Sequence, residues 1–394
     1  MKFLLALFFS LSIFCGQAQF LLSGTVIDGF TKKPVAGASV FINNATKGTV
    51  TTEAGKFVIN NLNSGNFELV ISIIGYETFL KSLASTKQIE SQVFELAPKA
   101  VKLKEVNIYP KSVRARYMSV FVSNFIGLSE NAFQCKILNQ DIIDFHYDKQ
   151  KDELEASTDD FLIIENKALG YRIKFLLTTF LLNDFNKFSH RTYYEGSAFF
   201  DEMIGGKSQK KIWIRNRRNT YEGSNMHFFR SAAFGLIRQY GFILHRLIRK
   251  PNENRPSDEA IRRKLDYFLS AKSASSADSI GYWNRKMDLP KVIQYLNSDT
   301  LSEQSIIKRT DKPNVFALSF KDMVYVSYTK GTSNLAKTQN VLFAIPNAPY
   351  SIMQLTEQYT FFDNNGIVLN PQSLLFEGYW ADHGKISNLL PIDF

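Results

Sequence analysis

The stretch "GTVIDGFTKKPVAGASVFI" (residues 24–42) sets the fold of the first part of the chain. It holds a Lys-Pro turn, then Gly-Ala, then alternating apolar residues. From Phe67 to Ile73 every second residue is apolar, which is typical of a strand with one buried face. Glycines such as Gly48 and Gly55 separate these runs where tight turns are needed. We therefore predict a small antiparallel β-sandwich over residues 19–98 that folds on its own.

Four motifs in this segment resemble the carboxypeptidase-regulatory-like domain. They are Gly24-x-Val26-x-Asp28, Pro34-Val35-x-Gly37-Ala38-x-Val40-x-Ile42, Gly48-Thr49-x-Thr51-x-Glu53-x-Gly55-x-Phe57 and Ile73-Ile74-Gly75-Tyr76. The resemblance implies a seven-stranded prealbumin-like sandwich, which is an appendage in enzymes and defines no activity. It also implies an exported Bacteroidota envelope protein. Leu103-Lys104-Glu105-Val106 resembles the strand that trails the module in TonB-dependent receptors, so residues 99–110 are predicted as a linker or trailing strand.

The N-terminus predicts export. Residues 1–18 combine Lys2, an apolar run and the small-residue exit Gly16-Gln17-Ala18, which is typical of a secretory signal peptide. The apolar run is shorter than the roughly 20 residues that span a membrane. Cleavage after Ala18 would leave Cys135 as the only cysteine and would exclude an internal disulfide. We expect a periplasmic or outer-membrane-associated protein.

Residues 111–394 predict a second domain of the α+β class, so the chain is predicted to be multidomain. A strand hairpin is expected around residues 143–156 and a long strand over 171–182. Helices are expected at 208–220, 224–240, 257–272 and 289–297, and strands return in the last hundred residues. Strand runs on both sides of a helical block favour α+β over an alternating parallel sheet. This part resembles an uncharacterised region that follows the sandwich in a group of Bacteroidota proteins, which implies no established activity.

The sequence contains no complete catalytic motif. None of the five histidines begins His-x-x-Glu or His-Glu-x-x-His, the spacings that a zinc peptidase uses. Ser224, His227 and Glu222 could form a hydrolytic set, but the apolar stripe from Met226 to Tyr240 predicts a helix with Ser224 as its N-cap. We predict no catalytic residue, cofactor or metal site, and a non-enzymatic binding or scaffolding function in the envelope.

Two alternatives stay open. One is a hydrolase of envelope polymers with its site in the second domain. The other is a protein associated with an outer-membrane barrel, because Leu390, Ile392 and Phe394 alternate at the C-terminus as they do in such barrels, although Pro391 interrupts the strand.

The charge of the chain is concentrated in one segment. The net charge is +10, and residues 207–264 alone hold fifteen Lys or Arg against four Asp or Glu, a difference of +11. In an exported protein this favours an envelope protein, an anionic lipid head group or an acidic glycan as partner over nucleic acid. Alternatively, the positive segment is a helix face that is exposed to solvent and binds no partner. The candidate anion-binding residues are Lys210, Lys211, Arg215, Arg217, Arg218, Arg246, Arg249 and Lys250.

Two short patterns predict modification. Asp278-Ser279-Ile280 and Asp299-Thr300-Leu301 resemble the O-glycosylation sequon of exported Bacteroidota proteins. Ser279 follows a run of small residues that predicts an exposed linker, so it is the better candidate. Both patterns are also compatible with helix caps.

Overall fold

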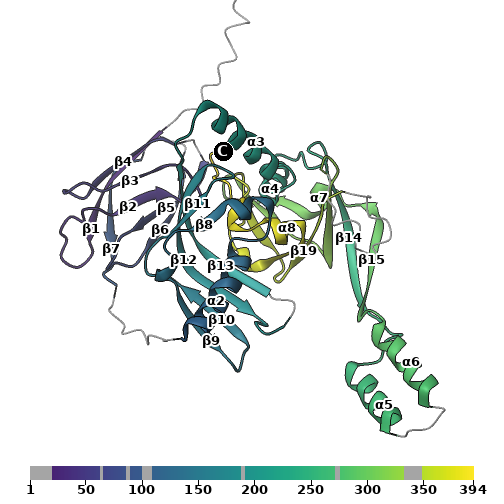
Figure 1. Cartoon of the computed structure of the whole chain (residues 1–394). Helices are drawn as coiled ribbons and strands as arrows, with labels where there is room; N and C mark the ends of the chain where they lie inside the picture. Colours follow the sequence, from purple (N-terminus) through teal and green to yellow (C-terminus); the bar gives the residue numbers. More distant parts are fainter. Residues whose placement is uncertain are drawn as a thin grey trace, which may run out of the picture.

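The computed structural model describes residues 20–62, 65–85, 89–99, 109–187, 191–270, 276–331 and 348–394. The predicted signal peptide and the predicted trailing strand at 103–106 lie outside these residues. The described chain forms an N-terminal β-sandwich, a second body that combines helices and sheets, and an arm that projects from that body (Figure 1). No helix among the described residues has the length and apolarity to cross a membrane.

The sandwich has the seven strands that the resemblance implies. They are β1 (Phe20–Asp28), β2 (Ser39–Ile42), β3 (Gly48–Val50), β4 (Lys56–Leu62), β5 (Gly65–Ser72), β6 (Phe79–Ser85) and β7 (Ile89–Leu96). One sheet has the order β4-β1-β7 and the other β3-β2-β5-β6. Leu22, Val26, Val40 and Leu69 are fully buried between the sheets. The alternation of apolar residues therefore places one face of each strand in the core, as predicted.

The outer face of the second sandwich sheet is also buried, against the second body. Phe41 is 2% exposed, and its ring centroid lies 5.5 Å from that of Phe199 and 5.9 Å from that of Phe161. Its cross-strand partner Val70 is fully buried. The turn after β2 joins the contact, because the Phe200 amide donates to the Ala45 carbonyl at 3.0 Å. The sandwich is thus fixed to the second body by apolar packing and by backbone hydrogen bonds.

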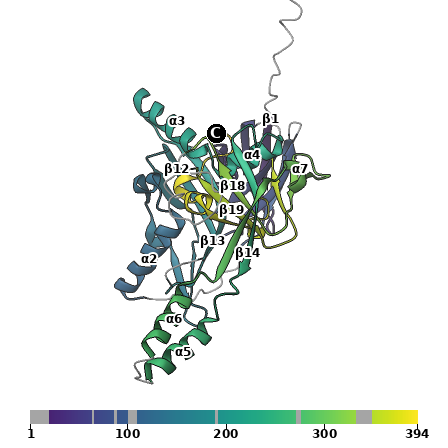
Figure 2. The same cartoon turned by 90° about the vertical axis from the view of Figure 1, so that its right-hand side faces the viewer.

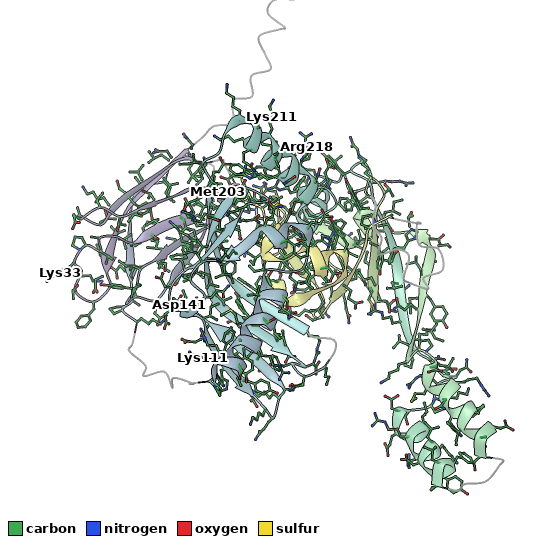
Figure 3. The ribbon with its side chains drawn as sticks, in the orientation of Figure 1. Lys33, Lys111, Asp141, Met203, Lys211 and Arg218 are labelled. Atoms are coloured by element: carbon green, nitrogen blue, oxygen red, sulfur yellow. The ribbon has the colours of Figure 1, made fainter. Side chains whose placement is uncertain are left out.

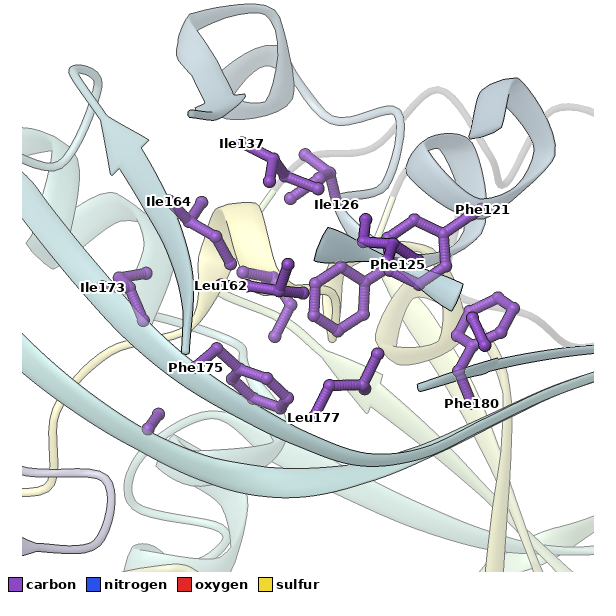
Figure 4. Close-up of a cluster of buried hydrophobic side chains, with 14 of the residues drawn as sticks. Phe121, Phe125, Ile126, Ile137, Leu162, Ile164, Ile173, Phe175, Leu177 and Phe180 are labelled. Atoms are coloured by element: carbon purple, nitrogen blue, oxygen red, sulfur yellow. The ribbon is translucent and has the colours of Figure 1, made fainter. Parts of the chain in front are cut away.

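A six-stranded sheet and one helix make the first half of the second body. The strands are β8 (Cys135–Ile137), β9 (Asp144–Asp148), β10 (Glu153–Ser157), β11 (Leu162–Asn166), β12 (Tyr171–Asn183) and β13 (Arg191–Glu202). Their order is β8-β11-β12-β10-β9, and β13 pairs with the other edge of β12. Helix α2 (Lys111–Phe125) inserts Phe121 and Phe125 against Phe175 and Phe180 of the sheet (Figure 4). The predicted hairpin and long strand are confirmed, whereas α2 was not predicted.

Two smaller sheets complete the body and confirm its α+β class. A five-stranded sheet has the order β15-β14-β18-β19-β21, and a three-stranded sheet has the order β16-β17-β20. The strands are β14 (Phe242–Pro251), β15 (Val292–Thr300), β16 (Ile307–Arg309), β17 (Val315–Leu318), β18 (Met323–Tyr328), β19 (Tyr350–Leu355), β20 (Thr360–Asp363) and β21 (Leu374–Gly378). Short elements contact these two sheets: α4 (Asn225–Ala233), α7 (Glu303–Ile306), α8 (Tyr379–His383) and the turn η4 (Pro371–Ser373). Three other turns pack with the six-stranded sheet: η1 (Glu130–Gln134), η2 (Gln140–Ile142) and η5 (Ile386–Asn388).

Helix α4 is shorter than the predicted 224–240. It ends at Ala233, because Gly235 adopts φ +70°. The Gly235 amide donates to the Ala232 carbonyl at 3.2 Å, and the Leu236 amide donates to the Ser231 carbonyl at 2.9 Å. This is a Schellman motif, which satisfies the last carbonyls of a helix and stops it.

The predicted helix at 289–297 is wrong. Helix α6 (Ser276–Asp288) ends before it, and residues 292–300 form strand β15, which pairs with β14 in antiparallel register. The other predicted helices are confirmed as α3 (Lys207–Tyr221) and α5 (Asp258–Ser270).

Helices α5 and α6 form a hairpin at the end of the β14–β15 ribbon. Both views show this arm standing away from the body, at the opposite end of the molecule from α3 (Figures 1 and 2). Ile261 and Ser276 are buried within the two helices.

Candidate functional site: a basic helix beside a polar cleft

The inner face of α3 is anchored on the turn at residues 167–170. Trp213 is buried, and its Nε1 donates to the Lys167 carbonyl at 2.9 Å. Arg217 is 8% exposed and lies with its guanidinium 3.8 Å from the centre of the Tyr171 ring. Its Nε donates to the Leu169 carbonyl at 2.8 Å, and its Nη1 pairs with Glu202 at 2.7 Å. Arg217 therefore holds α3 in place.

This arrangement corrects the predicted anion-binding set. Arg217 is enclosed and already paired, so it cannot belong to an exposed patch. Arg246 and Arg249 lie on β14 and pair with Asp322 and Glu377; the Arg249 pair is bidentate, at 2.7 and 2.6 Å. Lys250, also on β14, is exposed, and its Nζ lies 6.0 Å from the centre of the Tyr295 ring. The eight predicted residues do not form one surface.

Four of the predicted residues, Lys210, Lys211, Arg215 and Arg218, lie on α3 together with Lys207, which was not predicted; we call these five the basic face of α3. All five are exposed, and no acidic residue occurs in α3. Lys207, Lys211, Arg215 and Arg218 follow the i, i+4, i+8, i+11 spacing that aligns side chains along one side of a helix. Figure 3 shows Lys211 and Arg218 on α3 at the edge of the molecule. Within the described chain, none of the five makes an ion pair.

Beside α3 lies a polar cleft of about 510 Å³. Three distant segments line it: residues 129–134, 216–226 and 379–390. Most of the lining side chains are amides or hydroxyls, namely Ser129, Asn131, Gln134, Asn216, Asn219, Thr220, Ser224, Asn225 and Asn388. Glu130 and Lys385 supply one charge of each sign, and the rings of Tyr379 and His383 stack with centroids 3.9 Å apart. The rest of the lining is Met226, Trp380, Gly384, Leu389 and Leu390.

Asn388 and Asn131 together join the three segments of the cleft. Asn388 Oδ1 accepts from Asn131 Nδ2 at 2.8 Å and from Ser129 Oγ at 3.2 Å, and Asn388 Nδ2 donates to the His383 carbonyl at 3.0 Å. Asn131 Nδ2 also donates to Thr220 Oγ1 on α3 at 3.0 Å. These bonds fix the orientation of the amides before any ligand is present.

Ser224 is the N-cap of α4, as predicted. Its Oγ accepts from the His227 amide at 3.1 Å. The His227 imidazole faces the other way: its Nδ1 accepts from the Gly223 amide at 3.1 Å. Burial, together with nearby Lys330 and Arg230, lowers the pKa of His227 to about 4. The Ser224 hydroxyl and the His227 ring are therefore not arranged as a proton relay.

Two potential catalytic groups of the cleft, Glu130 and His383, are close enough to interact: burial lowers the pKa of His383, and the Glu130 carboxylate opposes this shift. Both side chains line the cleft, but no hydrogen bond joins them within the described residues. His383 Nδ1 lies 3.1 Å from the Tyr379 carbonyl. Among the described residues, no three His, Cys, Asp or Glu side chains are placed together so that they could hold a metal ion.

The two predicted glycosylation sites lie in different settings. Ser279 lies in the first part of helix α6 and is half-buried, so the predicted exposed linker does not extend to it. Thr300 is the exposed last residue of β15.

Comparison with known proteins identifies the N-terminal part. Residues 22–108 match the family model of the CarboxypepD_reg-like domain, so the chain carries this domain at its N-terminus, as the four motifs implied. The match extends beyond the predicted boundary at residue 98 into the predicted linker. The protein is thus a multidomain chain in which a CarboxypepD_reg-like sandwich precedes an α+β body. No curated protein matches the chain.

Several solved structures share local similarity. A cohesin–X-dockerin complex of Acetivibrio cellulolyticus is 26% identical over 18% of this chain, with a TM-score of 0.16, and the chain spans about half (51%) of that protein. A candidate carbohydrate binding protein of Bacteroides uniformis is 9% identical over 40% of this chain and 57% of its own, with a TM-score of 0.18. A candidate membrane-associated protein of unknown function from Bacteroides fragilis is 8% identical over 91% and 93%, with a TM-score of 0.18. Scores this low carry no argument about function.

Proposed function

We propose that this protein is a non-enzymatic, exported component of the cell envelope that binds anionic lipid head groups through the basic face of α3. The observation that supports this is a row of exposed cations with no acidic neighbour on the helix. Elsewhere in the chain, the arginines of β14 and the inner arginine of α3 are paired with carboxylates. The basic face therefore keeps its charge available, and it does so as one row on a single helix.

The chemistry of the face suits phosphate at a lipid surface. Each Lys or Arg near an anionic membrane contributes roughly 1 kcal/mol, and Arg can bind phosphate with two N–H groups at once. Ile204 is fully exposed just before α3, and Ile214 is exposed on the helix. Apolar side chains beside cations are typical of helices that lie in a membrane interface.

Vesicle sedimentation tests the proposal. We expect the full chain to pellet at low salt with vesicles of phosphatidylglycerol and phosphatidylethanolamine but not with phosphatidylcholine. Salt should release the protein, because the screening length falls to about 8 Å at physiological ionic strength. The variant Lys211→Glu/Arg215→Glu/Arg218→Glu should lose binding with an unchanged melting temperature, since exposed charges contribute little to stability.

The matched control reverses three exposed cations of the arm. Arg262→Glu/Arg263→Glu/Lys264→Glu makes the same change in net charge on α5, at the opposite end of the molecule. It should keep vesicle binding if the basic face is the site. Absence of pelleting at low salt would overturn the lipid proposal, and binding to soluble polygalacturonate alone would reassign the face to an acidic glycan.

A hydrolase of envelope polymers is the second candidate. The observation that favours it is that Ser129, Glu130 and His383 reach the same cleft from distant parts of the chain. Incubation with purified peptidoglycan, followed by measurement of released reducing ends and amines, tests it. Release that disappears in Glu130→Gln would establish an enzyme and contradict the non-enzymatic proposal.

A further inference from the structure

We propose that the polar cleft beside α3 binds an uncharged saccharide. This inference is independent of the lipid proposal, which concerns the outward side of α3. The cleft volume of about 510 Å³ lies within the range of about 300–1,000 Å³ that small-ligand sites occupy.

Three of the lining amides each keep one fixed group for a ligand. Asn131 uses its Nδ2 for Thr220 and Asn388, which leaves its Oδ1 as an acceptor. Asn216 donates from Nδ2 to the Ala168 carbonyl at 2.9 Å and also keeps its Oδ1. Asn225 accepts the Met226 amide at 2.9 Å through Oδ1 and keeps its Nδ2 as a donor. Fixed acceptors and donors of this kind match hydroxyl groups, which both donate and accept.

Two further amides are exposed at the cleft. Gln134 on η1 and Asn219 on α3 both line it, and neither side chain makes a hydrogen bond within the described residues. Both can therefore turn toward a ligand that lies between η1 and α3. Since each amide group both donates and accepts, it can bind two neighbouring hydroxyls of one sugar ring.

Phe133 places an exposed aromatic ring on η1, the turn that supplies Glu130 and Gln134 to the cleft. The side chain is 85% exposed. Phe133 does not line the cleft itself, but residues three apart in a 3₁₀ turn are eclipsed, so it lies in register with Glu130, which does line the cleft. An exposed aromatic ring next to amides offers an apolar surface for the C–H face of a sugar ring, while the amides bind its hydroxyl edge.

The charge of the lining favours an uncharged ligand. Glu130 and Lys385 are the charged side chains that line the cleft, and their charges are opposite. A nucleotide or an acidic peptide would need an excess of cations in the lining, because a poorly solvated anion without a partner is costly. A saccharide needs hydrogen bonds and a stacking surface: the lining amides offer the first, and the exposed Phe133 ring on the adjoining turn η1 offers the second.

Isothermal titration calorimetry with the full chain tests this assignment. The probes are maltotetraose and the tetramer of N-acetylglucosamine as uncharged saccharides, and tetragalacturonate as the acidic comparison. We expect one of the two uncharged tetramers to bind. Phe133→Ala and Asn219→Ala should each weaken its Kd by roughly tenfold, and Phe133→Trp should keep it.

Two control variants separate the cleft from other effects. Phe30→Ala removes an equally exposed ring from the sandwich and should leave saccharide binding unchanged. The triple reversal of the basic face should lose vesicles but keep the saccharide, so failure of one proposal is distinguishable from failure of the other. The assignment is overturned if neither uncharged tetramer binds, if tetragalacturonate binds best, or if binding survives both cleft substitutions.

Discussion

At the scale of single residues, His227 is kept neutral by its surroundings. Its pKa falls from 6.5 to about 4, mainly through burial and then through Lys330 and Arg230. Between these two pH values the unfolded chain binds a proton on this ring and the folded chain does not. Because the unfolded state then holds more protons, the free energy of unfolding decreases as the pH falls from 6.5 to 4.

Removal of the titrating ring should flatten this dependence. His227→Asn keeps an acceptor for the Gly223 amide but does not titrate. We expect the variant to be less stable near neutral pH, and its free energy of unfolding to fall less steeply on acidification, by up to roughly 3 kcal/mol in total. Urea unfolding at several pH values measures the slope. His146→Asn, at an exposed histidine, serves as the control, and an unchanged slope in His227→Asn would refute the account.

Arg217 and Arg215 are two residues apart on α3, but truncation should destabilise the protein only at Arg217. Arg217→Ala removes the contacts to Leu169, Glu202 and the Tyr171 ring, and should cost on the order of 2 kcal/mol. Arg215→Ala removes an exposed side chain and should change stability by less than about 0.5 kcal/mol. Chemical unfolding of both variants checks this. Equal losses in the free energy of unfolding would mean that Arg217 stabilises the fold no more than Arg215 does.

At the scale of elements, Gly170 decides how closely α3 can approach the sheet. Its φ is +72°, and a Cβ built there would lie 2.2 Å from Trp213 Cδ2. Gly170→Ala should therefore lower the free energy of unfolding by at least about 2 kcal/mol, because it introduces backbone strain and overpacking. Gly206→Ala, at the N-cap of α3, meets no atom within 4 Å and should cost less than about 1 kcal/mol. Thermal unfolding compares the two variants, and similar losses would contradict the close-approach role of Gly170.

The sequence predicts those strands and helices that have a regular apolar periodicity bounded by turn residues. The sandwich strands alternate cleanly, and α3 and the 143–156 hairpin are visible from periodicity and turn residues alone. Helix α2 was missed because it buries only Tyr117, Phe121 and Phe125, spaced four residues apart, among Ser and Val residues of modest helix propensity. Residues 292–300 were predicted partly as helix, but pairing with β14 makes them a strand, since tertiary contacts override propensity.

The cleft could not be predicted, because its walls come from three segments with no shared pattern. Asn216, Asn219 and Asn225 are visible in the sequence, yet they lie within the charge run and were not interpreted separately. The Asn388 bonds to Asn131 and to the His383 carbonyl exist only once the chain has folded. The same holds for Arg217, whose charge was counted in the positive segment although its partner Glu202 precedes α3.

At the scale of the whole molecule, the sandwich is both a domain and part of an interface. Its core between the two sheets is complete within residues 20–99, apart from Ile392 of the C-terminal tail, which packs against it. The tail is held in place by backbone contacts: the Ile392 amide donates to the Asn44 carbonyl at 2.6 Å, and Arg230 donates to the Ile392 carbonyl at 2.7 Å. The sandwich alone would therefore keep its core but expose the face that the second body covers.

A fragment of residues 20–99 should fold cooperatively and self-associate. Phe41 and Val70 are adjacent across β2 and β5 and lose their cover in the fragment, so apolar surface becomes available for another copy. Phe41→Thr/Val70→Thr should make the fragment monomeric in sedimentation velocity. In the full chain, Phe41→Thr alone should lower the free energy of unfolding by about 3 kcal/mol, because Phe161 and Phe199 each lose their contact with the Phe41 ring. Leu80→Thr, on β6 opposite Val70 but exposed, should cost little. An unmodified fragment that stays monomeric at high concentration would show that this face does not need the second body.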